Sequence, residues 1–304
     1  MKKKTILISG ADGYIALHTT EQLKKNGYKV IRATRNKNGD LNMDFSDPKK
    51  IAELRISGVD TMIHTVTPNE LLYKTDPYFA ISENAVGIHA ALDFCVNNHI
   101  RDFIYISSFH VFGNKEGFLN EHTEGFPIND YGLSHHNAEQ TVKMFDNSNK
   151  VNSWILRPSN LFGIPYDIEK FKRWNLIPFS FCLEAIQHNK ITLLTSGSQY
   201  RNFVGVSDVC NKIQWILENR PKERIMHAYG NETISVFQYA SLVKKIAWEH
   251  FSIPVEIIKP EGNELIRQFE FCSIFNKSEL QPVMELENFI KDLLTILINR
   301  SLKE

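Results

Sequence analysis

Ser9-Gly10-Ala11-Asp12-Gly13-Tyr14-Ile15-Ala16 places two glycines three residues apart, between an apolar β-branched run and a segment with helical spacing. The run over residues 5–9 is predicted to be a strand, and residues 14–26 a helix. Glycine at such a turn lets the backbone bend sharply and leaves the first amides of the helix open to an anion. The stretch therefore predicts a dinucleotide site at Gly10 and Gly13, the alternative being a plain tight turn.

Strand-like and helix-like segments continue to alternate beyond this turn. Strands are predicted at residues 28–34, 41–45, 60–65, 102–107 and 151–157, and helices at 47–54, 78–97 and 131–145. This alternation is typical of an α/β protein of the Rossmann kind, a doubly wound parallel sheet covered on both faces. Ligands bind such sheets beyond the carboxyl ends of the strands, where Gly10, Thr65 and Ser108 should lie.

After Gly163 the regular alternation of predicted strands and helices ends, and the elements become mixed. Helices are expected at residues 179–188, 207–218 and 285–300, with a strand at 191–195 and further short elements between. We predict a dinucleotide-binding domain over residues 1–165, with a return segment near 203–230. A smaller mixed α/β substrate-binding domain should occupy residues 166–304.

Composition narrows the class of partner. The 304 residues include 35 Lys+Arg and 35 Asp+Glu, and this balance argues against nucleic acid or an anionic membrane. No stretch approaches the roughly 20 apolar residues that span a bilayer, and the basic start Met1–Lys4 precedes a short strand rather than a signal sequence. The four separated cysteines fit free thiols in a reducing compartment, so we expect a cytoplasmic protein.

The end of the second predicted strand bears on which dinucleotide binds. NAD sites usually have an acid there, whereas this chain has Arg32-Ala33-Thr34-Arg35-Asn36-Lys37 and no acid until Asp40. A guanidinium suits a 2′-phosphate, so Arg35 favours NADP, with NAD(H) still possible; the alternative is a solvated surface arginine.

Two further segments carry candidate chemistry. Ser108 ends the fifth predicted strand, and Tyr131 and His135 share one face at the start of the next helix. Each has a structural interpretation alone, as a turn cap or as packing. Found together in a chain that also has a predicted dinucleotide turn, they indicate a catalytic site. The histidines show no ligand spacing with acids or cysteines, so we predict no metal.

A series of short motifs stands in order along residues 4–280. They are Gly10-x-x-Gly13-x-x-Ala16, Asp60–Thr67, Asn84–Ile88, Ser107–Gly113, Glu121 with Pro127 and Tyr131–His135, Arg157–Gly163, and Ser196–Phe203. Together they resemble the motifs of the extended short-chain dehydrogenase/reductase family, the NAD(P)-dependent nucleotide-sugar epimerases, dehydratases and reductases. Alanine replaces the third glycine of the family's turn.

The resemblance implies roles for individual residues. Tyr131 would exchange a proton with the sugar oxygen that Ser108 holds, and Asn160 and Arg201 would bind the diphosphate of a nucleotide sugar. A homodimer through residues 78–97 and 131–145 is expected by analogy. The residues assigned to the cofactor are Gly10, Gly13, Tyr14, Ile15, Arg35, Asp44, Phe45, Thr65, Val66, Tyr131 and His135.

His135 departs from the family, which has lysine at this position. The lysine is a fixed cation that lowers the pKa of the tyrosine, whereas histidine is mostly neutral at pH 7. Three outcomes follow: Tyr131 acts as a protonated general acid, His135 is charged in the complex and replaces the lysine, or the site only binds. Because carbonyl reduction needs only the acid, the substitution favours a reductase.

We therefore predict an NADPH-dependent reductase of a nucleotide-activated 4-keto sugar, most simply a 4-keto-6-deoxy sugar. The enzymatic alternative is an NAD-dependent nucleotide-sugar 4-epimerase or 4-dehydrogenase. An alternative of another class is an NADP-binding regulator that has lost its chemistry. The sugar and its nucleotide are not identified by the sequence.

Overall fold

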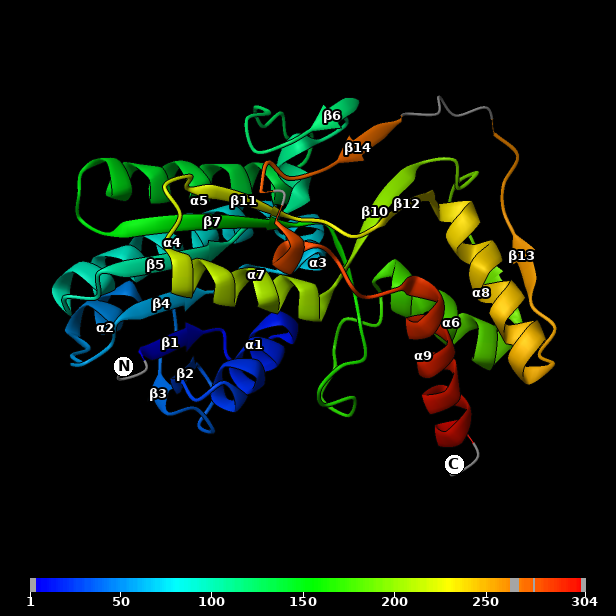
Figure 1. Ribbon diagram of the computed structural model, residues 1–304, viewed down its shortest axis with the longest axis horizontal. Helices are drawn as coiled ribbons and strands as arrows, with labels where there is room; N and C mark the ends of the chain where they lie inside the picture. The colour runs from blue at the N-terminus through cyan, green and yellow to red at the C-terminus, as the bar shows by residue number, and fades with distance from the viewer. Residues whose placement is uncertain (1–3, 263–267, 276, 302–304) are drawn as a thin grey trace.

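The computed structural model describes residues 4–262, 268–275 and 277–301. Its main sheet is parallel and has the strand order β3-β2-β1-β4-β5-β7-β11 (Figure 1). The order reverses between β1 and β4, which is where a doubly wound sheet opens a crevice for ligands. The strands are β1 (Thr5–Ser9), β2 (Lys29–Thr34), β3 (Leu41–Asn42), β4 (Thr61–His64), β5 (Asp102–Ile106), β7 (Asn152–Pro158) and β11 (Ile225–Ala228).

Helices cover both faces of this sheet. The first apolar core has two layers, one between the sheet and α2, α4 and α5 and the other between the sheet and α1 and α7. The predicted α/β fold with a doubly wound parallel sheet is confirmed. The helices are α1 (Tyr14–Lys25), α2 (Pro48–Glu53), α3 (Glu70–Thr75), α4 (Pro77–Asn97), α5 (Asp130–Asn147) and α7 (Val206–Asn219).

The remaining elements pack mostly around a second, separate apolar core at the other end of the molecule (Figure 1). Helices α6, α8 and α9 surround it, and two small sheets, β12-β10-β8 and β13-β9, flank it. These elements are β8 (Asn160–Phe162), α6 (Ile177–His188), β9 (Lys190–Thr192), β10 (Tyr200–Gly205), β12 (Glu232–Ser235), α8 (Val236–Phe251), β13 (Glu256–Ile258) and α9 (Leu286–Ser301).

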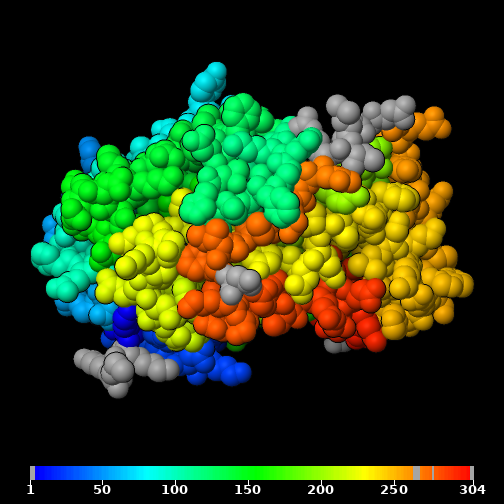
Figure 2. Space-filling model, turned by 45° about the horizontal axis from the view of Figure 1, so that its top comes forward, coloured from blue at the N-terminus to red at the C-terminus, as the bar shows by residue number. Residues whose placement is uncertain are grey.

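The chain crosses between these two cores more than once. After β10 it returns to the main sheet for α7 and β11, and later β14 (Phe269–Phe271) pairs with β6 (Gly117–Leu119). Figure 2 shows this late segment, in orange, lying against the teal surface around β6. Glu121 holds it there, because its carboxylate accepts hydrogen bonds from Ser273 and from the amides of His227 and Ile274.

Several predicted elements differ from the structure. The strand expected at residues 41–45 ends at Asn42, because Asp44 instead caps a turn by accepting the amide of Ser46. The six-residue helix α3 was not predicted, and the short elements expected after β11 include the 16-residue helix α8. Asp47 caps the predicted helix that follows it, since its carboxylate accepts the amide of Lys50.

Helix α4 corrects the expectation that no segment approaches a membrane span. Its 21 residues are long and apolar enough by length and composition. Half of the apolar window is nevertheless buried inside the protein, where Ile88, Leu92 and Phe94 pack against the main sheet. Its place in the core therefore explains the buried half of its apolar side chains.

Candidate active site

The glycine turn lies at the switch point of the sheet. Gly10 has φ of +71°, and a side chain there would meet Thr65, whose Oγ1 would be 2.7 Å from the added Cβ. The turn is closed by the amide of Gly13, which donates to the carbonyl of Gly10 at 2.8 Å. No side chain caps α1, so its first amides are available to an anion. This cradle fits the pyrophosphate of a dinucleotide.

Asp12, inside the turn, reaches the end of β2. Its carboxylate accepts hydrogen bonds from Thr34 at 2.6 Å, from Asn36 at 2.7 Å and from Arg32 at 2.8 Å. Partial burial acts to raise the pKa of Asp12, but these hydrogen bonds and the Arg32 charge outweigh it and hold the pKa below its ordinary value. Arg35 lies alongside in the same loop with an exposed side chain.

The other residues assigned to the cofactor contribute in different ways. The hydroxyl of Tyr14 donates to the carbonyl of Gly163 at 2.7 Å, and its ring packs on Phe171 and Phe179, so this side chain joins the two cores. Phe45 is buried against His64. Ile15 and Val66 are partly buried beside the turn. The carboxylate of Asp44 accepts a hydrogen bond from the hydroxyl of Ser46.

Tyr131 and Ser108 come together at the carboxyl end of β5. The side chain of Ser108 accepts the amide of His110 at the start of the 3-10 helix η1 (Phe109–Phe112), and it lies close enough to the Tyr131 hydroxyl to influence the pKa of that group. The Tyr131 ring is surrounded edge-on by His135, His110 and Tyr73, with ring centroids at 4.7, 5.3 and 5.6 Å. The predicted serine–tyrosine pair therefore forms one site.

Close backbone approach fixes this geometry. A Cβ at Gly132 would collide with the carbonyl oxygen of His110, so α5 meets η1 with no side chain between them. Asn84 of α4 donates to the carbonyl of Ser134 at 3.0 Å and holds the first turn of α5 from the other side. Asn129 caps the helix by accepting the amide of Gly132.

The electrostatic environment keeps both key side chains neutral. Burial raises the pKa of Tyr131 above the ordinary phenol value, and Glu70 adds to this effect, while Arg173 and Ser108 oppose it. Burial lowers the pKa of His135 to about 3, with His110 acting in the same direction. A neutral tyrosine thus lies beside a neutral histidine.

His135 makes one hydrogen bond through its ring. Its Nδ1 lies 2.8 Å from the hydroxyl of Tyr105, a buried residue of β5. Its Nε2 is buried and has no hydrogen-bond partner within the described part of the chain.

Two arginines, Arg173 and Arg201, and the polar Asn160 border the site on the side of the second core. Arg201 is largely buried and donates to the carbonyl of Tyr200 at 2.9 Å. Burial lowers the pKa of His110, and the nearby positive charge of Arg201 lowers it further. Asn160 donates to the carbonyl of Asn202 on the neighbouring strand. Arg173 donates to both oxygens of Glu70 at 2.7 Å, which ties the segment after β8 to α3.

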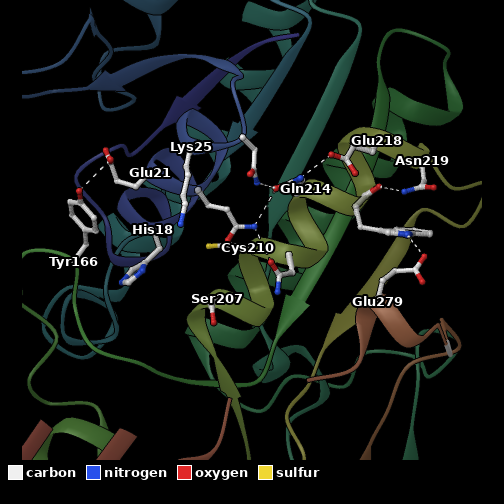
Figure 3. A pocket seen from close by; sticks show the side chains of 14 residues that line it. His18, Glu21, Lys25, Tyr166, Ser207, Cys210, Gln214, Glu218, Asn219 and Glu279 are labelled. Atoms are coloured by element: carbon white, nitrogen blue, oxygen red, sulfur yellow. Dashed lines mark hydrogen bonds between the residues drawn. The ribbon is translucent and has the colours of Figure 1, made fainter. Parts of the chain in front are cut away.

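One groove and the question of a metal site stand apart from the Tyr131 site. A groove of about 940 Å³ between α1 and α7 is lined largely by polar side chains, several of which are hydrogen-bonded to one another, as Gln214 is to Glu218 and Tyr166 is to Glu21 (Figure 3). It lies away from Tyr131. Among residues 4–262, 268–275 and 277–301, no three His, Cys, Asp or Glu side chains cluster as metal ligands would.

Sequence reasoning missed Asp12, Tyr73, Tyr105 and the Glu70–Arg173 pair. Asp12 could have been suspected from its place inside the turn. Alternate residues of a strand face the same side, and Tyr105 of β5 belongs to the apolar layer on the side of the sheet that α5 covers. No local pattern announces the pairing of Glu70 with Arg173, because they are distant in sequence.

A Rossmann sheet with a glycine cradle at its switch point and a serine–tyrosine pair beyond the carboxyl end of a nearby strand defines a dinucleotide-dependent enzyme of the short-chain dehydrogenase/reductase class. The chain belongs to the NAD dependent epimerase/dehydratase family, whose model matches residues 6–229. The identification with the extended branch of that class is confirmed.

Individual relatives span several reactions. The chain is 26% identical over 254 residues to a trifunctional UDP-glucose 4,6-dehydratase/UDP-4-keto-6-deoxy-D-glucose 3,5-epimerase/UDP-4-keto-L-rhamnose-reductase of Arabidopsis thaliana. That match covers 75% of this chain but only 37% of the larger relative. A putative UDP-glucose 4-epimerase of Methanocaldococcus jannaschii is 24% identical, with 94% and 96% of the two chains covered.

A solved structure shares the fold. RMD from Pseudomonas aeruginosa, complexed with NADPH, superimposes with a TM-score of 0.82 at 16% identity, covering 98% of this chain and all of that one. The relatives of this family are NAD(P)-dependent nucleotide-sugar epimerases, dehydratases and reductases.

Proposed function

We propose that the protein is an NADPH-dependent reductase of a nucleotide-activated 4-keto-6-deoxy sugar. The observation that carries the proposal is the neutral, buried His135 beside Tyr131, where the family has a cationic lysine. Without that cation, and with its pKa raised by burial, Tyr131 keeps its proton. A protonated phenol serves carbonyl reduction as a general acid, whereas alcohol oxidation needs the phenolate as a base.

Each residue then has a defined task. The bound nicotinamide would supply hydride chemistry, as it does throughout this class of enzyme. Ser108 orients the substrate carbonyl oxygen, and Tyr131 donates the proton that this oxygen gains on reduction. Gly10 and Gly13 accommodate the pyrophosphate of the cofactor. Asp44, Phe45 and Val66 border its adenosine half, and the backbone of Tyr14 and Ile15 presents helix amides to it.

Substrate binding is assigned to the second core. Arg201 is a largely buried guanidinium whose one described side-chain hydrogen bond goes to a backbone carbonyl, so it retains donors for a phosphate. Asn160 stands on the neighbouring strand β8, which pairs with β10 in register. Together they suit the diphosphate of a nucleotide sugar, as the family resemblance implies.

NADPH is proposed over NADH because Arg35 is exposed in the loop after β2, and a guanidinium suits a 2′-phosphate. One observation favours the second candidate, an NAD-dependent 4-epimerase. The carboxylate of Asp12 stands at the end of β2, where an acid would accept a ribose 2′-hydroxyl and repel a 2′-phosphate. Identifying the nucleotide that copurifies with the protein separates the two: tightly held NAD supports the epimerase, and loosely bound or absent nucleotide the reductase.

The pH dependence of turnover tests the proposed function. Tyr131 donates only while protonated, and its pKa is raised, so the reductive kcat should stay level from about pH 6 to about pH 9 at saturating NADPH. His135, with its pKa lowered to about 3, stays neutral throughout and should add no limb near the ordinary imidazole pKa of about 6.5. The measurement is the rate of NADPH oxidation with UDP-4-keto-6-deoxy-D-glucose and related keto sugars.

A matched variant sharpens this test. His135→Lys adds a fixed cation beside Tyr131, so the alkaline loss of reduction should begin at lower pH and oxidation of the alcohol product should become faster. A limb near pH 6.5 in the native protein that vanishes in His135→Ala would instead assign a charged role to the histidine. NADPH binding without turnover of any keto sugar would favour the regulator.

A further inference from the structure

A loop of the second core is docked on the first turn of α1. It comprises residues 163–173, which lie between β8 and α6. The hydroxyl of Tyr14 donates to the carbonyl of Gly163 at 2.7 Å, and the ring of Phe171 packs on that of Tyr14 with centroids 5.3 Å apart. Because Tyr14 directly follows Gly13, both ends of this loop come close to the dinucleotide turn.

Two further contacts hold the docked loop. The hydroxyl of Tyr166 donates to the carboxylate of Glu21, two turns along α1, at 3.3 Å (Figure 3). At the end of the loop, Arg173 donates to the carboxylate of Glu70 on α3. The loop is thus fixed against the Rossmann half at several points, so the side chains that it carries have a defined place beside the cofactor site.

Lys170 is an exposed cation of this loop and directly precedes Phe171. Its amine pairs with Asp167 at 2.7 Å, and its side chain is 76% exposed. The hydrogen bond and the charge of Asp167 raise the pKa of Lys170 most, and the charges of Asp12 and Arg32 also act on it, the first raising and the second lowering it. The amine therefore lies within electrostatic reach of the Asp12–Arg32 pair.

The acid in the turn poses a problem for NADPH that a cation in this place would solve. The carboxylate of Asp12 accepts three hydrogen bonds, and one of them, from Arg32, balances its charge. A phosphate monoester carries about two negative charges at neutral pH. With Arg32 committed to Asp12, Arg35 alone would offer only one positive charge to a 2′-phosphate. A second cation at the end of β2 is needed to balance it.

We propose that Lys170 is a specificity-determining residue whose amine binds the 2′-phosphate of NADPH together with Arg35. Within the described part of the chain, only Asp167 accepts a hydrogen bond from its three N–H donors, and its long exposed stem is flexible. This inference deepens the cofactor half of the proposed function and rests on it. It reconciles the acid Asp12 with the proposed preference for NADPH.

Affinity for the two nucleotides tests the inference. In calorimetric titrations, Lys170→Gln should weaken NADPH binding by about three- to tenfold, as for one charged hydrogen bond that stays partly in water. NADH has no 2′-phosphate, so its affinity should not change. Lys172→Gln is the matched control, because it removes the same charge from an exposed lysine of the same loop, and should bind both nucleotides as the native protein does.

A pair of smaller probes isolates the phosphate. Adenosine 2′,5′-bisphosphate carries the 2′-phosphate without the nicotinamide, and AMP lacks that phosphate. Lys170→Gln should lose affinity for the bisphosphate by the same factor as for NADPH and should bind AMP unchanged. Equal losses for the two probes would show that Lys170 only supports the docked loop, and would overturn the inference.

Three further results would overturn it. They are unchanged NADPH affinity in Lys170→Gln, equal losses in Lys170→Gln and Lys172→Gln, and equal losses for NADPH and NADH. A native protein that prefers NADPH, with the preference intact in Lys170→Gln, would contradict the inference and leave the proposed function standing. None of these titrations needs a sugar substrate, so absence of keto-sugar turnover would count against the proposed reductase alone.

Discussion

Tyr131→Phe is expected to lower the rate of keto-sugar reduction by about a hundred- to ten-thousandfold, the usual contribution of a general acid. Phenylalanine keeps the ring that packs against Tyr73, His110 and His135 and removes only the hydroxyl that Ser108 contacts. NADPH affinity and stability should therefore change little. Steady-state kinetics with a saturating keto sugar, alongside an NADPH titration, measure both effects.

The neighbouring Tyr73→Phe provides the control for this prediction. Its hydroxyl is also buried, and its ring lies 5.6 Å from that of Tyr131, but it is not paired with Ser108. We expect it to lose less than about tenfold in kcat, as for a structural hydroxyl. Tyr131→Phe retaining more than about a tenth of native kcat would show that another group donates the proton.

Glu139→Ala should reduce the free energy of unfolding by about 3–5 kcal/mol, since it leaves a buried charge without its partner. The Glu139 carboxylate accepts two hydrogen bonds from Arg157, at 2.6 and 2.8 Å, and one from Ser107 at 2.6 Å. Its side chain is fully buried, and that of Arg157 is 3% exposed. Denaturant titration should show a lower midpoint with little change in slope.

A paired replacement separates the lost ion pair from simple truncation. Glu139→Leu combined with Arg157→Met removes both charges and should recover most of the stability that Glu139→Ala loses. A loss below about 1 kcal/mol in Glu139→Ala would contradict a fully desolvated pair. Because Ser107 precedes Ser108, the single substitution should also disturb the site.

The parts of this molecule that follow from local patterns were predictable. The glycine turn, the strand-to-helix alternation and the apolar strands led to the parallel sheet, and the order of β1 and β4 brings Gly10 against Thr65 as expected. Ser108 and Tyr131 meet because the start of α5 packs against the segment that follows β5, where Gly132 approaches the carbonyl of His110. Helix α4 was correctly expected near residues 78–97.

Contacts between distant side chains were not predictable in the same way. Hydrophobic periodicity reports which face of an element is buried, but not which polar partner it meets there. Thus Arg173 of the second core pairs with Glu70 of α3, and Tyr105 pairs with His135, without any local signal. The domain limits, the homodimer, the cytoplasmic location and the preference for NADPH stay predictions.

The most direct test of the whole account is calorimetric titration of the protein with NADPH and with NADH. We predict that the native protein binds both, NADPH more tightly. Gly10→Ala should abolish binding because its Cβ would meet Thr65, whereas Gly58→Ala, with the similar φ of +74° but no atom within 4 Å, should bind as the native protein does. No binding of either nucleotide at millimolar concentration, or equal binding by the Gly10 and Gly58 variants, would contradict the dinucleotide site on which every later step depends.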